Sequence, residues 1–85
     1  MRLDKYLKVS RLIKRRTVAK EIVDAGRVKL NGKIAKPGSE VNVGDQIEIG
    51  FGQRQVRAEI REIRETVRAE EAGSLYRMLE GEPVE

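Results

Sequence analysis

Cationic side chains are the residues of this sequence best suited to bind a ligand. They gather in the first 20 positions, around three consecutive cations at Lys14, Arg15 and Arg16. Arginine forks and lysine ammonium groups bind phosphate oxygens, and arginine can also contact the edge of guanine. Such contacts give affinity more readily than sequence specificity. The cluster therefore predicts recognition of a folded nucleic acid by its shape and backbone.

Charge is divided unevenly along the chain. Residues 1–36 hold twelve basic and three acidic residues, a net charge of +9, whereas residues 37–85 have a net charge of −5. This asymmetry predicts an oriented contact between the first half and a polyanion. Like charges repel a phosphate backbone, so we expect the acidic second half to face away from it, toward solvent or protein.

Catalytic chemistry has little support in the composition. The chain has neither histidine nor cysteine, so the usual acid/base group of neutral pH, thiolate metal sites and disulfides are excluded. The serines and threonines lack a histidine to activate them. The dense carboxylates after residue 58 alternate with arginine, as on a solvated surface with exposed ion pairs. We expect no enzyme activity, no catalytic residue, no metal site and no cofactor.

Two short helices must position the cations. With 85 residues, the chain is expected to be one small domain. Leu3, Tyr6 and Leu7 have the spacing of one helical face over about residues 2–10. A loop with the three cations follows, and Thr17 has the chemistry of an N-cap for a second helix. Val18, Ile22 and Ala25 are the expected buried stripe of that helix, and Gly26 its left-handed end.

Strands are expected after Gly26. The alternation over residues 27–30, the Asn31-Gly32 pair and residues 33–36 predict a hairpin with a type I′ turn. Further strands are expected at residues 46–49 and from residue 56 to about 60, separated by a turn at Gly50-Phe51-Gly52. The spacing of Ala72, Leu75, Tyr76 and Leu79 predicts a C-terminal helix. The three aromatic residues, Tyr6, Phe51 and Tyr76, are expected in the core.

These elements predict an α+β fold in which two N-terminal helices pack on a small, mostly antiparallel β-sheet, with a short C-terminal helix added. We expect residues 1–66 to form the RNA-binding domain and residues 67–85 an acidic helix and tail.

The spaced motifs of residues 1–50 resemble the S4 RNA-binding domain family. The matching segments are Arg2-Leu3-Asp4-Lys5-Tyr6-Leu7, Ser10-Arg11, Arg15-Arg16-Thr17, Gly26-Arg27-Val28, Leu30-Asn31-Gly32 and Val43-Gly44-Asp45-Gln46-Ile47. The resemblance implies that the paired helices and their basic loop bind structured RNA. The predicted RNA-binding residues are Arg2, Asp4, Lys5, Lys8, Arg11, Lys14, Arg15, Arg16, Thr17 and Lys20.

Within this family, the stretch from Met1 to Thr17, the later Phe51-Gly52-Gln53 and the acidic end resemble stand-alone members that act in ribosome-associated quality control, and the short length also fits them. The resemblance implies binding to obstructed large ribosomal subunits through large-subunit rRNA and peptidyl-tRNA. It also implies support for an RqcH-class tailing factor that adds alanines to the C-terminus of stalled nascent chains. We further expect a cytoplasmic monomer with no membrane partner.

Two alternatives stay open. A heat-shock-type S4 protein that recycles dissociated large subunits would carry a longer, basic C-terminal tail, whereas this chain ends in acidic residues. A helix-turn-helix DNA-binding protein would read bases from the start of its second helix. Here that helix starts Val18-Ala19-Lys20, which offers few such side chains.

Overall fold

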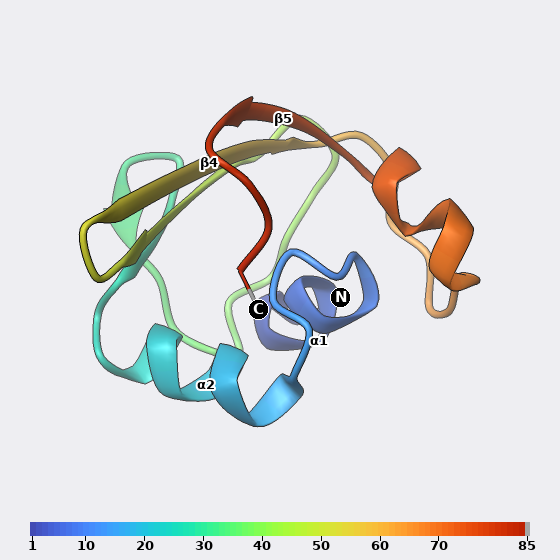
Figure 1. Ribbon diagram of the computed structural model, residues 1–85. Helices are drawn as coiled ribbons and strands as arrows, with labels where there is room; N and C mark the ends of the chain where they lie inside the picture. Colours follow the sequence, from blue (N-terminus) through green and yellow to red (C-terminus); the bar gives the residue numbers. More distant parts are fainter. Residues whose placement is uncertain (85) are drawn as a thin grey trace.

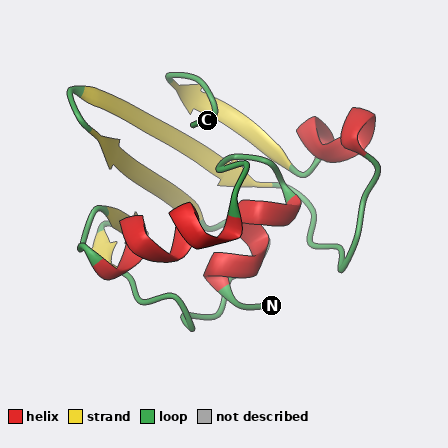
Figure 2. Cartoon of the chain, turned by 60° about the horizontal axis from the view of Figure 1, so that its bottom comes forward, coloured by secondary structure: helices red, strands yellow, loops and turns green. Residues whose placement is uncertain are grey.

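Alternating apolar residues build an antiparallel sheet in this computed structural model, which describes residues 1–84. The strand order is β2-β1-β3-β4-β5, and both α-helices cover one face (Figures 1 and 2). The elements are α1 (Leu3–Val9), α2 (Arg16–Asp24), β1 (Val28–Leu30), β2 (Lys33–Ile34), β3 (Gln46–Phe51), β4 (Arg54–Ile60), the 3-10 helix η1 (Ala69–Ser74) and β5 (Tyr76–Glu80). The expected α+β class is confirmed. Among residues 1–84, no helix has the length and hydropathy needed to cross a bilayer.

Helix α1 buries Leu3, Tyr6 and Leu7, the face that their spacing predicts. The first two amides of the helix, from Leu3 and Asp4, donate to carbonyls of the loop at residues 37–39. The Tyr6 hydroxyl donates to the carbonyl of Leu75 at 2.7 Å, and burial raises the pKa of Tyr6 well above its usual range. The helix is thus tied to the chain just before β5.

Helix α2 begins at Arg16, so Thr17 lies within the helix and its predicted role as N-cap is wrong. Arg15 takes the cap position, and no side chain caps the helix. The buried residues are Ala19, Ile22 and Val23, so of the predicted stripe only Ile22 is fully confirmed. Val18 is half-buried and Ala25 is exposed. The helix ends at Asp24, and Ala25 therefore belongs to its C-terminal cap.

Gly26 ends α2 as expected, with a φ of 76°. Its N–H donates to the carbonyl of Val23 and the next N–H, from Arg27, to that of Ile22, which is the Schellman pattern. The predicted Asn31-Gly32 turn is also confirmed, because both residues have positive φ. Gly26 thus sets the direction in which the chain leaves α2 for β1, and Asn31-Gly32 turns the chain from β1 into β2.

The core lies between the helices and the inner face of the sheet. Ile47 and Ile49 of β3 and Val56, Ala58 and Ile60 of β4 point into it, as their alternation predicts. Tyr6 is in the core as expected and Tyr76 is half-buried.

Phe51 departs from the sequence prediction in two respects. It is 37% exposed, so its predicted core position is wrong. It belongs to β3, where it pairs with Arg54 across a turn at residues 52–53, which lies one residue later than expected.

The predicted C-terminal helix is present only as the 3-10 helix η1, and its expected continuation over Tyr76 and Leu79 is wrong. Ala72 and Leu75 are buried at the spacing of one 3-10 turn, and the chain then extends into β5, antiparallel to β4. Without β5, the backbone N–H and C=O groups along the outer edge of β4 would be unpaired. Hydrogen bonding to them stabilises a strand here more than the spacing of four apolar residues stabilises a helix. The division of the chain at residue 66 stays a prediction.

Candidate nucleic-acid interface

A buried carboxylate lies beneath the predicted cationic surface. The side chain of Asp4 is only 4% exposed, at the start of α1. Arg2 Nε lies 3.2 Å from Oδ1 of Asp4, and Arg2 Nη2 donates to Oδ2 at 3.3 Å. Arg16 Nη2 approaches the same Oδ2 at 3.9 Å from the first turn of α2. Asp4 therefore brings together two arginines that lie on different elements.

This arrangement leaves the two arginines facing solvent. Their side chains are 58% exposed for Arg2 and 55% for Arg16. A guanidinium has five N–H donors, so an arginine bound to a carboxylate through one edge keeps others for a phosphate. Because Asp4 neutralises one of the two charges, the cluster keeps a net positive charge. Asp4 contacts both arginines, and a buried carboxylate is itself a poor ligand for a polyanion.

Lys5, the next cation along α1, is engaged by the acidic half of the chain. Its Nζ donates to Oε2 of Glu65, in the segment between β4 and η1. The hydrogen bond and the charge of Lys5 lower the pKa of the Glu65 carboxyl below its ordinary value. The expectation that the acidic half keeps away from the cationic surface is therefore wrong at Glu65.

The linker between the helices, residues 10–15, presents further cations. Arg11 has a φ of 61°, in the left-handed region where glycine is the usual residue. The linker turns sharply at this point, and its next two residues, Leu12 and Ile13, are fully buried. Lys14 and Arg15 follow on the surface. The alternation of buried and exposed positions lets the linker hold its cations outside the core.

Of the other predicted residues, Lys8, Thr17 and Lys20 are exposed on the helices. Lys8 lies one turn after Lys5 on α1, and Lys20 one turn after Arg16 on α2, so each extends a row of cations. The structure thus joins Arg2, Asp4 and Arg16 by direct contact. It places the remaining predicted residues on the same two helices and their linker.

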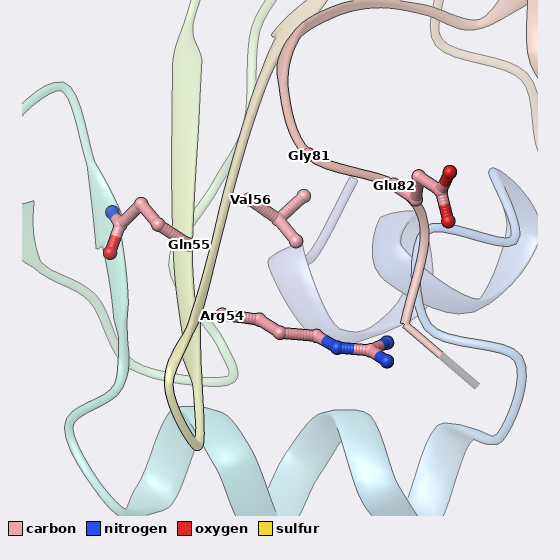
Figure 3. Close-up of a pocket in the computed structure, with 5 residues that line it drawn as sticks. All are labelled: Arg54, Gln55, Val56, Gly81 and Glu82. Atoms are coloured by element: carbon pink, nitrogen blue, oxygen red, sulfur yellow. The ribbon is translucent and has the colours of Figure 1, made fainter.

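Arg54 is a cation outside the predicted interface, in the half of the chain that has a negative net charge. It starts β4 and lines a hollow of about 350 Å³ with Gln55, Val56, Gly81 and Glu82. Figure 3 shows its side chain extending from β4 below the segment that carries Glu82. No sequence pattern indicated that Arg54 would lie beside residues 81 and 82, because the return of residues 81–84 to the helices is a tertiary feature.

A second, larger hollow lies at the end of the sheet near η1. Arg61, Arg64 and Arg77 line it, together with Glu62 and Glu71, and its volume is about 570 Å³. Arg64 Nη2 lies 3.5 Å from Glu62 Oε2. The acids nearly balance the arginines there, so this hollow attracts a polyanion less than the helical surface does.

The fold and the cationic helix pair define a class of RNA-binding protein. The S4 domain profile matches residues 1–47, which span α1, α2, β1 and β2. The chain belongs to the S4 domain family, as its motifs predicted.

Individual proteins and solved structures are similar to this chain over most of its length. The chain is 56% identical over 84 residues to the RQC P-site tRNA stabilizing factor of Halalkalibacterium halodurans, covering 99% of this chain and 96% of that protein. It is 51% identical over 82 residues to the Bacillus subtilis protein of the same name, covering 96% and 95% of the two chains. The trimeric structure of Vibrio cholerae heat shock protein 15 superposes with a TM-score of 0.83 at 39% identity, covering 92% of this chain and 80% of that one.

Proposed function

We propose that this chain is a non-catalytic RNA-binding factor of ribosome-associated quality control. It binds obstructed large ribosomal subunits, where its helical surface contacts large-subunit rRNA and peptidyl-tRNA. The observation that carries the proposal is the Arg2–Asp4–Arg16 cluster, in which a buried carboxylate orients two exposed guanidinium groups. The names of relatives that share half of the sequence across nearly the whole chain support the P-site tRNA as a ligand.

On the obstructed subunit, the factor supports an RqcH-class protein while that partner adds a C-terminal alanine tail to the stalled nascent chain. The proposed RNA-binding residues are those predicted from the sequence, with Asp4 as the residue that positions its neighbours. The protein acts in the cytoplasm as a monomer, and size-exclusion chromatography with light scattering tests the monomer against the trimer named for the heat-shock relative.

The similarity to heat shock protein 15 favours a second candidate, the recycling of dissociated large subunits. That comparison leaves a fifth of the heat-shock protein uncovered, whereas the quality-control relatives are covered almost completely. The two functions differ in their preferred particle. A quality-control factor prefers subunits that hold peptidyl-tRNA, and a recycling factor binds vacant subunits equally well.

Co-sedimentation with obstructed and vacant large subunits tests the proposal. We expect preference for obstructed subunits, and a roughly tenfold loss of affinity in Arg16→Ala, because one charge-assisted contact is worth about 1.5–3 kcal/mol. Arg68→Ala is the matched control, since Arg68 is an exposed arginine outside the helix pair. Equal losses of affinity in Arg16→Ala and Arg68→Ala would refute the proposed RNA-binding site on the helices. A preference for duplex DNA over RNA would favour the helix-turn-helix alternative.

A further inference from the structure

The last described residues leave the edge of the sheet and return to the helices. We call residues 81–84 the C-terminal strap. The backbone N–H of Val84 donates to the carbonyl of Leu12 at 2.6 Å, and Val84 pairs with Ile13 in an isolated parallel bridge. Figure 1 shows the strap descending from β5 to end beside α1 and the linker. Segments about 70 residues apart in the sequence are therefore joined at the linker that carries Arg11, Lys14 and Arg15.

Both ends of the strap have specific contacts. The side chain of Val84 is only 3% exposed and belongs to the same core cluster as Leu12 and Ile13. At the other end, Gly81 has a φ of 78°, and a Cβ on it would lie 2.5 Å from the carbonyl oxygen of Gln55. Only glycine satisfies both conditions, so the course of the strap is set where it leaves β5 and where it reaches the linker.

The linker in turn depends on this contact. The amide of Leu12 donates to the Ser10 hydroxyl at 3.3 Å and that of Ile13 to the Leu7 carbonyl at 3.1 Å. The carbonyl of Leu12 accepts from the strap. If residue 84 moves away from the linker, this buried carbonyl loses its partner, which is unfavourable. The left-handed Arg11 beside it adds strain that also favours rearrangement.

We propose that the strap is a positioning element for the nucleic-acid interface. By holding Leu12 and Ile13, it fixes the directions in which Arg11, Lys14 and Arg15 leave the linker. Preorganised cations lose less conformational freedom when they bind a phosphate, so their affinity is higher. This inference rests on the proposed function, because it assigns to the strap the support of that same surface. The anchoring groups are the backbone amide and the apolar side chain of Val84.

Val84→Asn tests the proposal without changing the net charge. We expect its affinity for obstructed large subunits to fall roughly tenfold. We also expect a shallower salt dependence, by about one to two phosphate contacts, because displaced cations no longer reach their phosphates. Amide exchange at Ile13 should accelerate, and Val84→Ile, which keeps an apolar anchor, should restore both affinity and protection.

Two control variants separate positioning by the strap from a general loss of stability and from a change in charge. Ile47→Val trims a buried residue of β3, a strand that pairs with β1 and β4 and not with the strap, so it lowers stability but should bind normally at a temperature where it is folded. Glu82→Gln removes an acid from the strap and keeps the Val84 anchor, so its affinity should not fall. Normal binding by Val84→Asn, or losses in it no larger than in Ile47→Val, would overturn the proposal.

Tighter binding by both Val84→Asn and Glu82→Gln would also overturn it, because the strap would then act as an electrostatic screen. Failure of the unmodified protein to bind subunits would instead contradict the proposed function. In that case the exchange rate of the Ile13 amide in Val84→Asn still decides whether the strap holds the linker.

Discussion

Asp4 is an acid at the centre of a surface proposed to bind a polyanion. If net charge alone governed affinity, Asp4→Asn would bind RNA more tightly. We expect weaker binding, by roughly five- to tenfold, because Arg2 and Arg16 lose the carboxylate that orients them. Filter binding with large-subunit rRNA at fixed salt measures the difference.

Asp24→Asn is the matched control for this substitution. Asp24 is an exposed acid in the last turn of α2, and its replacement changes the net charge by the same amount. Its affinity should stay constant or rise slightly. If the two variants bind equally tightly, Asp4 has no orienting role.

Arg11 shows a conflict between local conformation and charge. A non-glycine residue in the left-handed region is strained by about 1–2 kcal/mol, and Arg11 has a φ of 61°. We expect Arg11→Gly to leave the free energy of unfolding unchanged or to raise it by up to about 1 kcal/mol, while RNA affinity falls. Urea unfolding and filter binding measure the two effects. A destabilised variant, or one that binds normally, would show that the arginine is kept for its contacts within the protein.

At the scale of single residues, the sequence predicted which side chains are cationic and exposed, but not how they are connected. Asp4 and Arg16 are on different helices, and Glu65 reaches Lys5 from 60 residues away. Such pairs depend on distances between elements, and no local pattern specifies them. The candidate interface residues could be named from the sequence and stay a prediction, whereas the contacts of Asp4 with Arg2 and Arg16 became visible only in the structure.

The C-terminal end of α2 depends on the backbone conformation of Gly26, and a substitution there can test this. Gly26 occupies the left-handed position of a Schellman motif, and a Cβ there would meet nothing within 4 Å. The penalty for Gly26→Ala is therefore conformational, and we expect a loss of about 1–2 kcal/mol of stability. Gly73→Ala is the control, because Gly73 also has open space around it but no positive φ. Thermal or urea unfolding should show little change, or slight stabilisation, for the control. Equal effects at the two positions would mean that the helix end does not depend on the left-handed conformation of Gly26.

Among the elements, those with a turn residue at a required backbone conformation were predictable. Gly26 and Asn31-Gly32 placed the end of α2 and the first hairpin correctly, because few residues adopt positive φ. The structure of residues 69–80 was not predictable in this way, because its apolar spacing suits a helix while the open edge of β4 favours a strand. The start of α2 also differed from expectation, since Arg15 caps it without any side-chain hydrogen bond.

Across the whole molecule, the two faces of the sheet differ in charge balance. On the outer face, Lys29 stands opposite Glu48, and Arg57 lies 3.8 Å from Glu48 and 3.9 Å from Glu80. Charges of opposite sign alternate along this row from β1 to β5. Among residues 1–84, the helices and their linker carry fewer acids than cations, and most of these cations face solvent. A polyanion should therefore bind one side of the molecule.

This one-sided distribution predicts a specific salt dependence. If the helices and linker neutralise about four to six phosphates, log affinity for RNA should fall against log salt concentration with a slope of about −3 to −5. Arg16→Gln should make the slope shallower by about one contact. Arg77→Gln removes the same charge from β5, beside the hollow whose acids nearly balance its arginines, and should leave the slope unchanged. A flat salt dependence would exclude a phosphate-backbone contact, and equal changes in both variants would mean that RNA reaches the sheet edge as well as the helices.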